Sequence, residues 1–274
     1  KIMGLSLGMF GKGNKTPEEK VQILKDKMRY GRMMIFTDQD VDGSHIKGLV
    51  MNFIHSLFEE CFMIKGFMIS LVTPIVKIIK GKKTIKEFYT ETDYEKWLET
   101  TQMKGWKSKY YKGLGTSTAK EAKEYFKDFE NKIVNYDGNN EESYKAMILA
   151  FNQDKKSNSA DMRKEWLKGY NRNEIIEQTE KNITLDDFIN KDLIHFSNYS
   201  CERAIPNVID GLKTSIRKIV YCLKKKNLKN EIKVAQFSGY VSENSNYHHG
   251  ENNLLGAIIG LAQGFVGSNN IQLC

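Results

Sequence analysis

The sequence contains no apolar run near the roughly 18 residues that a membrane-spanning helix needs. Its first residues lack the basic, apolar and small-residue zones of a secretory signal peptide. The cysteines are scattered without any Cys-x-x-Cys spacing, which argues against a zinc site and a disulfide framework. These absences predict an intracellular protein with free thiols and no membrane partner. The four cysteines are Cys61, Cys201, Cys222 and Cys274.

A nucleotide-binding fingerprint is also missing. Residues 113–116 read Gly-Leu-Gly-Thr, but they lack the Gly-Lys-Ser/Thr ending of a P-loop. ATP hydrolysis is therefore not expected of these 274 residues. No internal repeat is apparent, and a chain of this length more often holds two domains than one.

Acidic residues are nearly absent from one stretch of this basic chain. The net charge is +8, and the segment from Lys213 to Lys233 holds eight cations against the single acid Glu231. A solvated cationic surface is the usual explanation of a charge run, but acidic residues normally intersperse such a surface. A helix from Leu212 would place Lys213, Arg217 and Lys224 where they can follow a phosphate backbone.

Three carboxylates alternate in the loop Asp38-Gln39-Asp40-Val41-Asp42-Gly43. Crowded carboxylates repel one another unless a hard cation neutralises them, and Mg²⁺ and Ca²⁺ both prefer oxygen ligands. An EF-hand would need a Glu at the twelfth loop position, which is Leu49 here. The loop therefore favours a Mg²⁺ that assists chemistry on a phosphate, the alternative being an acidic turn that only caps a helix with Ser44.

The first part of the chain has an α/β pattern. We expect a mobile Lys-rich stretch over 12–27, a buried strand over 33–36 and a helix over 44–60 that Ser44 caps. The apolar residues expected on one face of this helix are Ile46, Leu49, Val50, Phe53, Ile54, Leu57 and Phe58. Further strands are expected over 67–71, 75–79 and 86–89, with a hairpin turn at 81–83.

The rest of the chain is predicted to be mainly helical. The polar, Asn-rich residues 131–158 are expected to form an excursion or linker. Short helices linked by turns, one of them strongly basic, suggest a helix-turn-helix or winged-helix unit that binds DNA. The expected helices cover 161–170, 186–197, 212–225, 233–240 and 252–265.

Tyr247-His248-His249-Gly250-Glu251 forms a second polar constellation. Adjacent side chains on one element point in different directions, and no cysteine or further histidine lies nearby, so a zinc site is not expected. We expect a structural role for one histidine and a phosphate contact for the other.

Together these motifs resemble one family, the type IIA DNA topoisomerases of the eukaryotic topoisomerase II kind. The resemblance implies a Rossmann-like α/β TOPRIM domain over residues 1–170, with a polar insert near 131–160. It also implies a linker and the front part of a mainly α winged-helix domain over 171–274. The matching stretches are 1–5, 37–48, 73–77, 110–117, 163–167, 187–191, 205–218 and 233–270.

The resemblance also implies roles for individual residues. Asp38, Asp40 and Asp42 would bind Mg²⁺, while Arg217, His248 and His249 would contact the scissile phosphate or its neighbourhood. Duplex DNA, a homodimeric enzyme and the nucleus are implied as partners and location, or alternatively a virus-encoded enzyme in an infected cell. The lysines expected to contact DNA are Lys47, Lys112, Lys213, Lys218, Lys224 and Lys233.

Some features of the family are replaced or lie outside this sequence. Thr214 stands where the family has Pro, and Ile216 stands where it has Gln. The nucleophilic Tyr, a fourth acidic ligand and the ATPase module are expected beyond the two ends, so this chain alone is predicted not to cleave DNA. The rival interpretations are a TOPRIM nuclease or primase-like enzyme and a non-enzymatic winged-helix DNA-binding protein.

Overall fold

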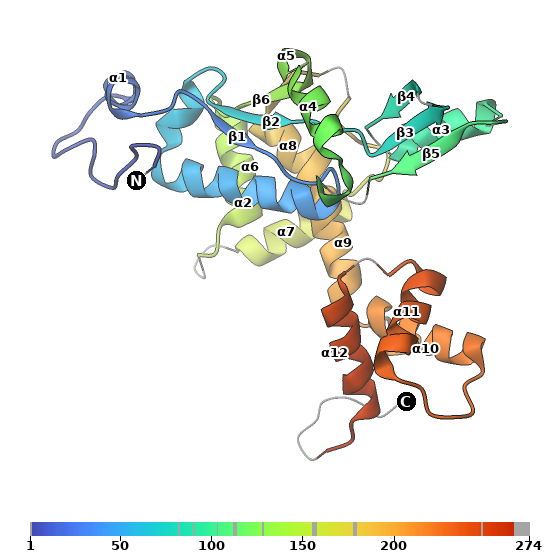
Figure 1. Cartoon of the computed structure of the whole chain (residues 1–274). Coiled ribbons are helices and arrows are strands. Elements are labelled where there is room, and N and C mark those ends of the chain that lie inside the picture. Colours follow the sequence, from blue (N-terminus) through green and yellow to red (C-terminus); the bar gives the residue numbers. More distant parts are fainter. Residues whose placement is uncertain are drawn as a thin grey trace. The chain divides into compact units, whose positions relative to one another are not determined.

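The computed structural model describes residues 2–81, 83–89, 91–102, 104–111, 114–127, 129–154, 158–177, 180–247 and 249–265. The chain divides into two compact units, Lys1–Asn198 and Tyr199–Cys274, which are described separately (Figure 1). Within the described ranges, no helix combines the length and the apolar character that crossing a membrane requires.

A mixed four-stranded sheet organises the described part of the first unit. Its strands are β1 (Met33–Ile35), β2 (Met68–Leu71), β6 (Ile133–Asp137) and β7 (Asn182–Thr184), in the order β1-β2-β6-β7. β1 runs parallel to β2, β2 runs antiparallel to β6, and β6 runs parallel to β7. The strands expected over 33–36 and 67–71 are thus confirmed.

Strand β2 is buried on both faces. Met68 contributes to the main core, whereas Ile69 and Leu71 pack with Tyr125 on the other side. Successive side chains of a strand point to opposite faces, so two separate clusters cover this strand. The uninterrupted apolar character of 67–69 follows from this position.

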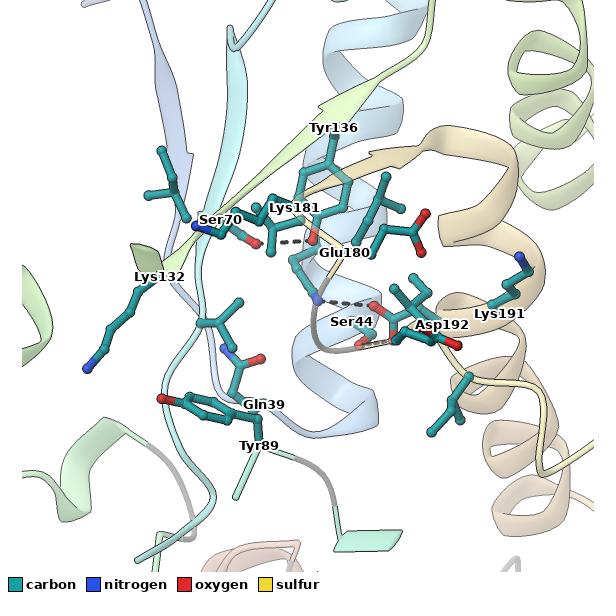
Figure 2. A pocket seen from close by; sticks show the side chains of 18 of the residues that line it. Gln39, Ser44, Ser70, Tyr89, Lys132, Tyr136, Glu180, Lys181, Lys191 and Asp192 are labelled. Carbon is teal, nitrogen blue, oxygen red and sulfur yellow. Dashed lines mark hydrogen bonds and ion pairs between the residues drawn. The ribbon is translucent and has the colours of Figure 1, made fainter. Parts of the chain in front are cut away.

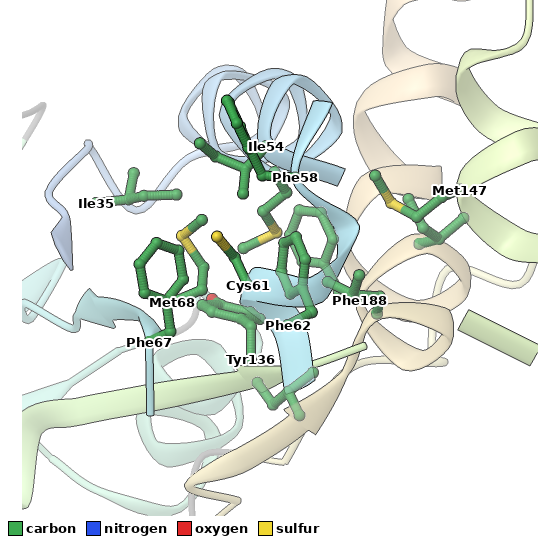
Figure 3. Packing of buried hydrophobic residues seen from close by; sticks show 14 of the residues in the cluster. Ile35, Ile54, Phe58, Cys61, Phe62, Phe67, Met68, Tyr136, Met147 and Phe188 are labelled. Atoms are coloured by element: carbon green, nitrogen blue, oxygen red, sulfur yellow. The ribbon is translucent and has the colours of Figure 1, made fainter. Parts of the chain in front are cut away.

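The main core lies between the sheet and helices from distant parts of the sequence (Figure 3). Ile54 and Phe58 come from α2 (Val41–Leu57) and its end, Met147 comes from α6 (Glu141–Phe151), and Phe188 ends α8 (Leu185–Phe188). Phe188 is fully buried and meets the ring of Tyr136 edge-on at 5.6 Å between centroids.

Residues 182–194 belong to the first unit. β7 pairs with β6, and Leu185, Ile189 and Leu193 are buried in the main core. This segment was expected to belong to the linker and the winged-helix part over 171–274, whereas the compact units divide after Asn198. Strand pairing and apolar burial, neither visible in the local sequence, account for the difference.

The segment over 131–158 is structured, contrary to the expected linker or excursion. It supplies β6, an inner strand of the sheet, and α6, whose Asn140 caps the helix by accepting a hydrogen bond from Ser143 N–H. The expected mobile stretch over 12–27 likewise contains α1 (Pro17–Lys27). A capping box between Thr16 and Glu19 begins this helix, which the high lysine content had obscured.

Helix α2 differs from expectation in its start and in its buried face. Its N-cap is Asp40 rather than Ser44, so the helix begins at Val41. Phe53 is 61% exposed, whereas Lys47 and Met51 are buried. The predicted apolar stripe is therefore divided: Ile54 and Phe58 are buried in the main core and Val50 packs against it, while the other members face solvent. The exposed members are Ile46, Leu49, Phe53 and Leu57.

A three-stranded antiparallel sheet forms a smaller part of the first unit. Its strands are β3 (Val76–Lys80), β4 (Lys83–Phe88) and β5 (Lys107–Tyr110), in the order β4-β3-β5. Helix α3 (Glu91–Thr100) packs Trp97 against Phe88, at 5.2 Å between ring centroids. The expected strands over 75–79 and 86–89 are confirmed as a paired hairpin.

The remaining elements of the first unit are short. The helix expected over 186–197 is continuous in space but contains a π-helical segment, η3, between α8 and α9. These elements are η1 (Glu59–Met63), η2 (Leu114–Thr116), α4 (Ala119–Lys127), α5 (Phe129–Lys132), α7 (Ser159–Lys168), η3 (Ile189–Leu193) and α9 (Ile194–Ala204), the last of which continues into the second unit.

The second unit packs three helices around its own core. The helices α10 (Thr214–Lys226), α11 (Val234–Ser245) and α12 (Glu251–Ala262) match the three amphipathic segments expected here. Ile219, Phe237 and Leu254 join them in a separate buried cluster. The chain as a whole is a mixed α/β protein that is mostly helical, as predicted.

Candidate functional site

The acidic loop connects the end of β1 to the start of α2, and backbone groups hold two of its carboxylates. Asp40 Oδ1 accepts a hydrogen bond from Gly43 N–H at 2.7 Å, which caps α2. Asp38 Oδ1 accepts one from Leu114 N–H at 2.7 Å, which joins the loop to η2. Asp42 lies in the first turn of α2. The loop is thus fixed at both ends by main-chain donors.

Gly43 is required by a close approach of the backbone. A Cβ at this position would lie 1.9 Å from the carbonyl oxygen of Asp38. No side chain fits at that distance, so any other residue must displace the acidic loop.

We expect Gly43→Ala to lower the free energy of unfolding by about 1–3 kcal/mol, because the added methyl group forces the loop apart. Urea unfolding followed by circular dichroism measures the change. Gly239→Ala in α11 is the matched control, since nothing lies within 4 Å of its Cβ position. This control should stabilise the protein by about 0.5–1 kcal/mol, as alanine favours a helix interior. Equal stability of both variants would contradict the close approach.

The carboxylates of the acidic loop carry the oxygen atoms that a hard divalent cation prefers. Within the described ranges, no group of three or more His, Cys, Asp or Glu side chains lies close enough to hold a metal. Asp38 and Asp40 each accept a backbone hydrogen bond through Oδ1. The second oxygen of a carboxylate held in this way is the type of ligand that a hard cation prefers. Binding of one ion by Asp38, Asp40 and Asp42 stays a prediction.

A network around Glu121 supports the segment that contacts Asp38. Lys109 Nζ donates to both carboxylate oxygens of Glu121, at 2.8 and 2.9 Å, and the Tyr111 hydroxyl donates to the same group. Burial alone would raise the pKa of Glu121, but hydrogen bonds from Lys109, Thr118 and Tyr111 lower it to about 2. The carboxylate therefore stays ionised and keeps β5 tied to α4.

Lys47 lies in the interior, although it was expected to contact DNA. Its side chain is 10% exposed, and Nζ lies 3.1 Å from Asp192 Oδ2. Burial alone would lower the pKa of the Lys47 ammonium, but Tyr136 and Asp192 raise it above its usual value. The lysine is therefore a permanent internal cation, and its burial does not support a DNA contact.

A cavity of about 440 Å³ opens beside Lys47 and the start of α2 (Figure 2). Gln39 of the acidic loop, Ser44 of α2 and Asp192 line it, and so do Ser70 and Tyr136 of the sheet. Ser70 and Tyr136 share a hydrogen bond of 3.0 Å through their hydroxyl groups. The hydroxyl groups of the sheet wall are therefore bonded to each other, and Ile133, Val134 and Ile183 add apolar surface to the same wall.

Arg217 in the second unit is held by an acidic neighbour. Its Nε lies 2.6 Å from Asp210 Oδ2, and a second guanidinium nitrogen lies 2.8 Å from Oδ1. The Arg217 hydrogen bonds lower the pKa of Asp210 to about 2, so this pair persists at neutral pH. The same guanidinium donates to Leu212 O at 2.9 Å, which presets its position at the start of α10.

The other residues expected to contact DNA differ in their surroundings. Lys213, Lys224 and Lys233 are exposed around α10 and the start of α11, while Lys218 Nζ donates to Asn246 O at 2.9 Å. His249 lies 3.2 Å from the Tyr199 hydroxyl through Nε2. The predictions for Lys112 and His248 fall outside the described residues.

The acidic partners of these cations could not be found from the sequence. Asp192 is 145 positions from Lys47, and Asp210 is seven positions from Arg217 across a turn. Because Asp192 is far along the chain from Lys47, and Asp210 lies in a turn outside the helix that carries Arg217, no periodicity within one element indicated the pairs. Glu121 was not singled out in the sequence either. It lies three residues after Thr118, whose hydroxyl group donates a hydrogen bond to its carboxylate.

Comparisons with known proteins agree along the chain. A family model described as the C-terminal associated domain of TOPRIM matches residues 71–201. A second one, described as a DNA gyrase/topoisomerase IV subunit, matches residues 203–274. The two matches meet near the division between the compact units.

Relatives with similar sequences include eukaryotic proteins named DNA topoisomerase 2. The chain is 49% identical to the probable DNA topoisomerase 2 of Dictyostelium discoideum over 93% of its length, which is 16% of that protein. It is 51% identical to DNA topoisomerase 2 of Saccharomyces cerevisiae over 90% of its length, or 17% of that protein. The chain therefore spans less than a fifth of the length of these curated relatives.

A solved structure agrees with the sequence matches. The DNA-binding, cleavage and re-ligation domain of Plasmodium falciparum topoisomerase II superposes with a TM-score of 0.76 at 46% identity. The match covers 89% of this chain and 33% of that one. Sequence and structure together show that the chain belongs to the type IIA DNA topoisomerases of the eukaryotic topoisomerase II kind.

Proposed function

We propose that this chain is part of the DNA cleavage and religation region of an ATP-dependent type II DNA topoisomerase. The observation that carries the proposal is the likeness to the cleavage and re-ligation domain from Plasmodium falciparum, at 46% identity and a TM-score of 0.76. In the whole enzyme, a nucleophile supplied outside this chain would break each strand of one duplex, a second duplex would pass, and the break would be resealed. ATP would bind in a module that is also outside this chain.

The acidic loop is proposed to supply carboxylates to a divalent cation, with Mg²⁺ as the specific ion. Asp38, Asp40 and Asp42 are the candidates, and backbone donors orient the first two. When bound, such a cation stabilises negative charge on a phosphate oxygen. The proposed arrangement is a TOPRIM fold for the first unit and a winged-helix fold for the second.

Arg217 and the exposed lysines are proposed to contact the DNA backbone. A guanidinium binds a phosphate with the same bidentate geometry that it uses with a carboxylate. A DNA phosphate can therefore replace the Asp210 carboxylate as the partner of Arg217. His248 and His249 are proposed to lie near the scissile phosphate. The proposed partners are duplex DNA and a second copy of the protein, and the proposed location is the nucleus.

We expect this chain to bind duplex DNA with a steep dependence on salt but to form no covalent adduct with it. A protein that neutralises six or more phosphates loses about a thousand-fold in affinity between 50 and 200 mM salt, because bound counterions are released. Fluorescence anisotropy with labelled duplex DNA measures the binding, and denaturing electrophoresis detects adducts. An adduct formed by this chain alone would contradict the proposed division of the catalytic groups.

Two triple variants, which remove the same charge from different surfaces, test which surface binds DNA. Replacing Lys213, Lys224 and Lys233 by alanine should flatten the salt dependence, since each phosphate contact contributes about 0.9 to its slope. The control removes the same charge from Lys145, Lys164 and Lys168, which are exposed lysines of α6 and α7. An equal loss of affinity in both variants would argue against the basic stretch as the DNA-binding surface.

A further inference from the structure

One carboxylate joins the start of α2 to the π-helical segment η3. Asp192 Oδ1 accepts a hydrogen bond from Ser44 Oγ at 2.7 Å, and Asp192 Oδ2 accepts one from Lys47 Nζ at 3.1 Å (Figure 2). Both donors lie within seven residues of Val41, the first residue of α2. Asp192 therefore holds the helix turn that directly follows the acidic loop.

The surroundings make this contact stronger than a surface ion pair. The Lys47 side chain is 10% exposed and that of Asp192 is 27% exposed. The Lys47 ammonium also lies 5.7 Å from the centre of the Phe188 ring, which belongs to the main core. Breaking such a pair on one side leaves the other charge poorly solvated, so both side chains are held in place.

A second contact connects the same two elements. The imidazole of His45 stacks on the ring of Phe196, with centroids 3.9 Å apart and planes 9° from parallel. Phe196 belongs to α9, which directly continues η3. Three contacts, through Ser44, His45 and Lys47, thus attach the first turns of α2 to residues 192–196.

Asp192 lies within the π-helical segment η3, which contacts α2. Segment η3 interrupts the run of helix between α8 and α9, and its Ile189 and Leu193 are buried in the core. Such segments are rare and are found frequently at functional positions, which gives Asp192 a significance beyond packing.

We propose that Asp192 is a positioning residue that fixes the first turn of α2, and with it the acidic loop, to the segment that leads into α9. The proposal deepens the proposed function and rests on it, because the orientation of Asp38 and Asp40 toward a cation depends on where α2 begins. Asp192 itself does not contact the cation or the DNA in this assignment.

The test compares Asp192→Asn with Asp186→Asn in the same chain. Asp186 Oδ1 accepts a hydrogen bond from Ser143 Oγ at 2.9 Å, so the control removes a similar serine–aspartate bond from the same unit. Hydrogen exchange of the amides of residues 44–47 reports the fixation of α2, and calorimetric titration with MgCl₂ reports the cation affinity.

We expect Asp192→Asn to speed the exchange of these amides about 10-fold and to weaken Mg²⁺ binding about 10-fold, which is the usual size of an effect exerted behind the ligands. Asp186→Asn should change neither quantity. Asp192→Glu keeps the carboxylate and should recover most of the cation affinity. If Asp192→Asn fails to fold, Ser44→Ala removes one of the two bonds and should shift exchange in the same direction.

The outcomes separate this proposal from the proposed function. Unchanged exchange at residues 44–47 in Asp192→Asn, or equal changes in Asp186→Asn, would overturn the positioning role. If the wild-type chain binds no Mg²⁺ but Asp192→Asn still exchanges faster at residues 44–47, the positioning role is supported and the cation part of the proposed function is contradicted.

Discussion

Asp40→Asn in the full-length enzyme is expected to reduce cation-dependent DNA cleavage at least about 100-fold while leaving DNA binding nearly unchanged. Mutating a residue that only hydrogen-bonds to a metal ligand already lowers metal affinity or activity about 10–100-fold. Asp40 is proposed as a ligand itself, so a larger loss is expected. Asparagine is as good an N-cap as aspartate, so the substitution removes the charge but keeps the bond from Gly43 N–H that begins α2. Cleavage is measured on supercoiled plasmid over a range of Mg²⁺ concentrations, and binding by anisotropy.

Asp40→Ala separates the cap from the charge. Alanine loses both, so this variant should cleave as poorly as Asp40→Asn and should also be less stable by about 0.5–2 kcal/mol. Wild-type cleavage by Asp40→Asn would show that Asp40 only caps the helix. A parallel loss of DNA binding and cleavage in Asp40→Asn would count against a role in cation binding.

Phe188→Ala is expected to lower the free energy of unfolding by about 3–5 kcal/mol. Phe188 is fully buried, packs edge-on against Tyr136 and lies beneath the Lys47 ammonium. Its removal leaves a cavity at the junction of the sheet, α2 and η3, where the surrounding elements cannot all move inward. Urea unfolding with tryptophan fluorescence and circular dichroism measures the loss.

Phe53→Ala is the matched control for this cavity. Phe53 lies on α2, near the same core, but its side chain is largely exposed. The control should change the stability by less than about 0.5 kcal/mol, as surface substitutions usually do. A comparable loss from both variants would contradict the assigned burial of the two rings.

The sequence predicted most elements of the fold correctly where periodicity or turn residues were strong. The strands over 33–36 and 67–71, the hairpin around Gly81 and the three helices after Gly211 all appear within a few residues of the expected positions. The errors arose where composition was used as a guide. Lysines obscured α1, whose capping box between Thr16 and Glu19 was legible, and asparagines obscured β6.

The buried face of α2 could not be predicted from its apolar period. Ile46, Leu49 and Phe53 of the expected stripe are exposed, while Ile54 of the same stripe is buried together with Ser44, Lys47 and Met51. Burying a lysine is costly unless a counter-charge is provided, and Asp192 provides it from a distant part of the chain. The choice of face therefore depends on a partner that local sequence cannot reveal.

For the candidate site, alternating carboxylates after a strand, a basic stretch without acids and a run of family motifs indicated the candidate groups and the family. The family is confirmed, and the roles of the individual groups stay predictions. Which of these groups are available depended on the folded chain. In the folded chain, Asp40 caps α2, Lys47 is buried beside Asp192, and Arg217 forms an ion pair with Asp210. The physical reason is that residue type and local spacing are written in the chain, whereas burial and charge pairing depend on segments that meet only after folding.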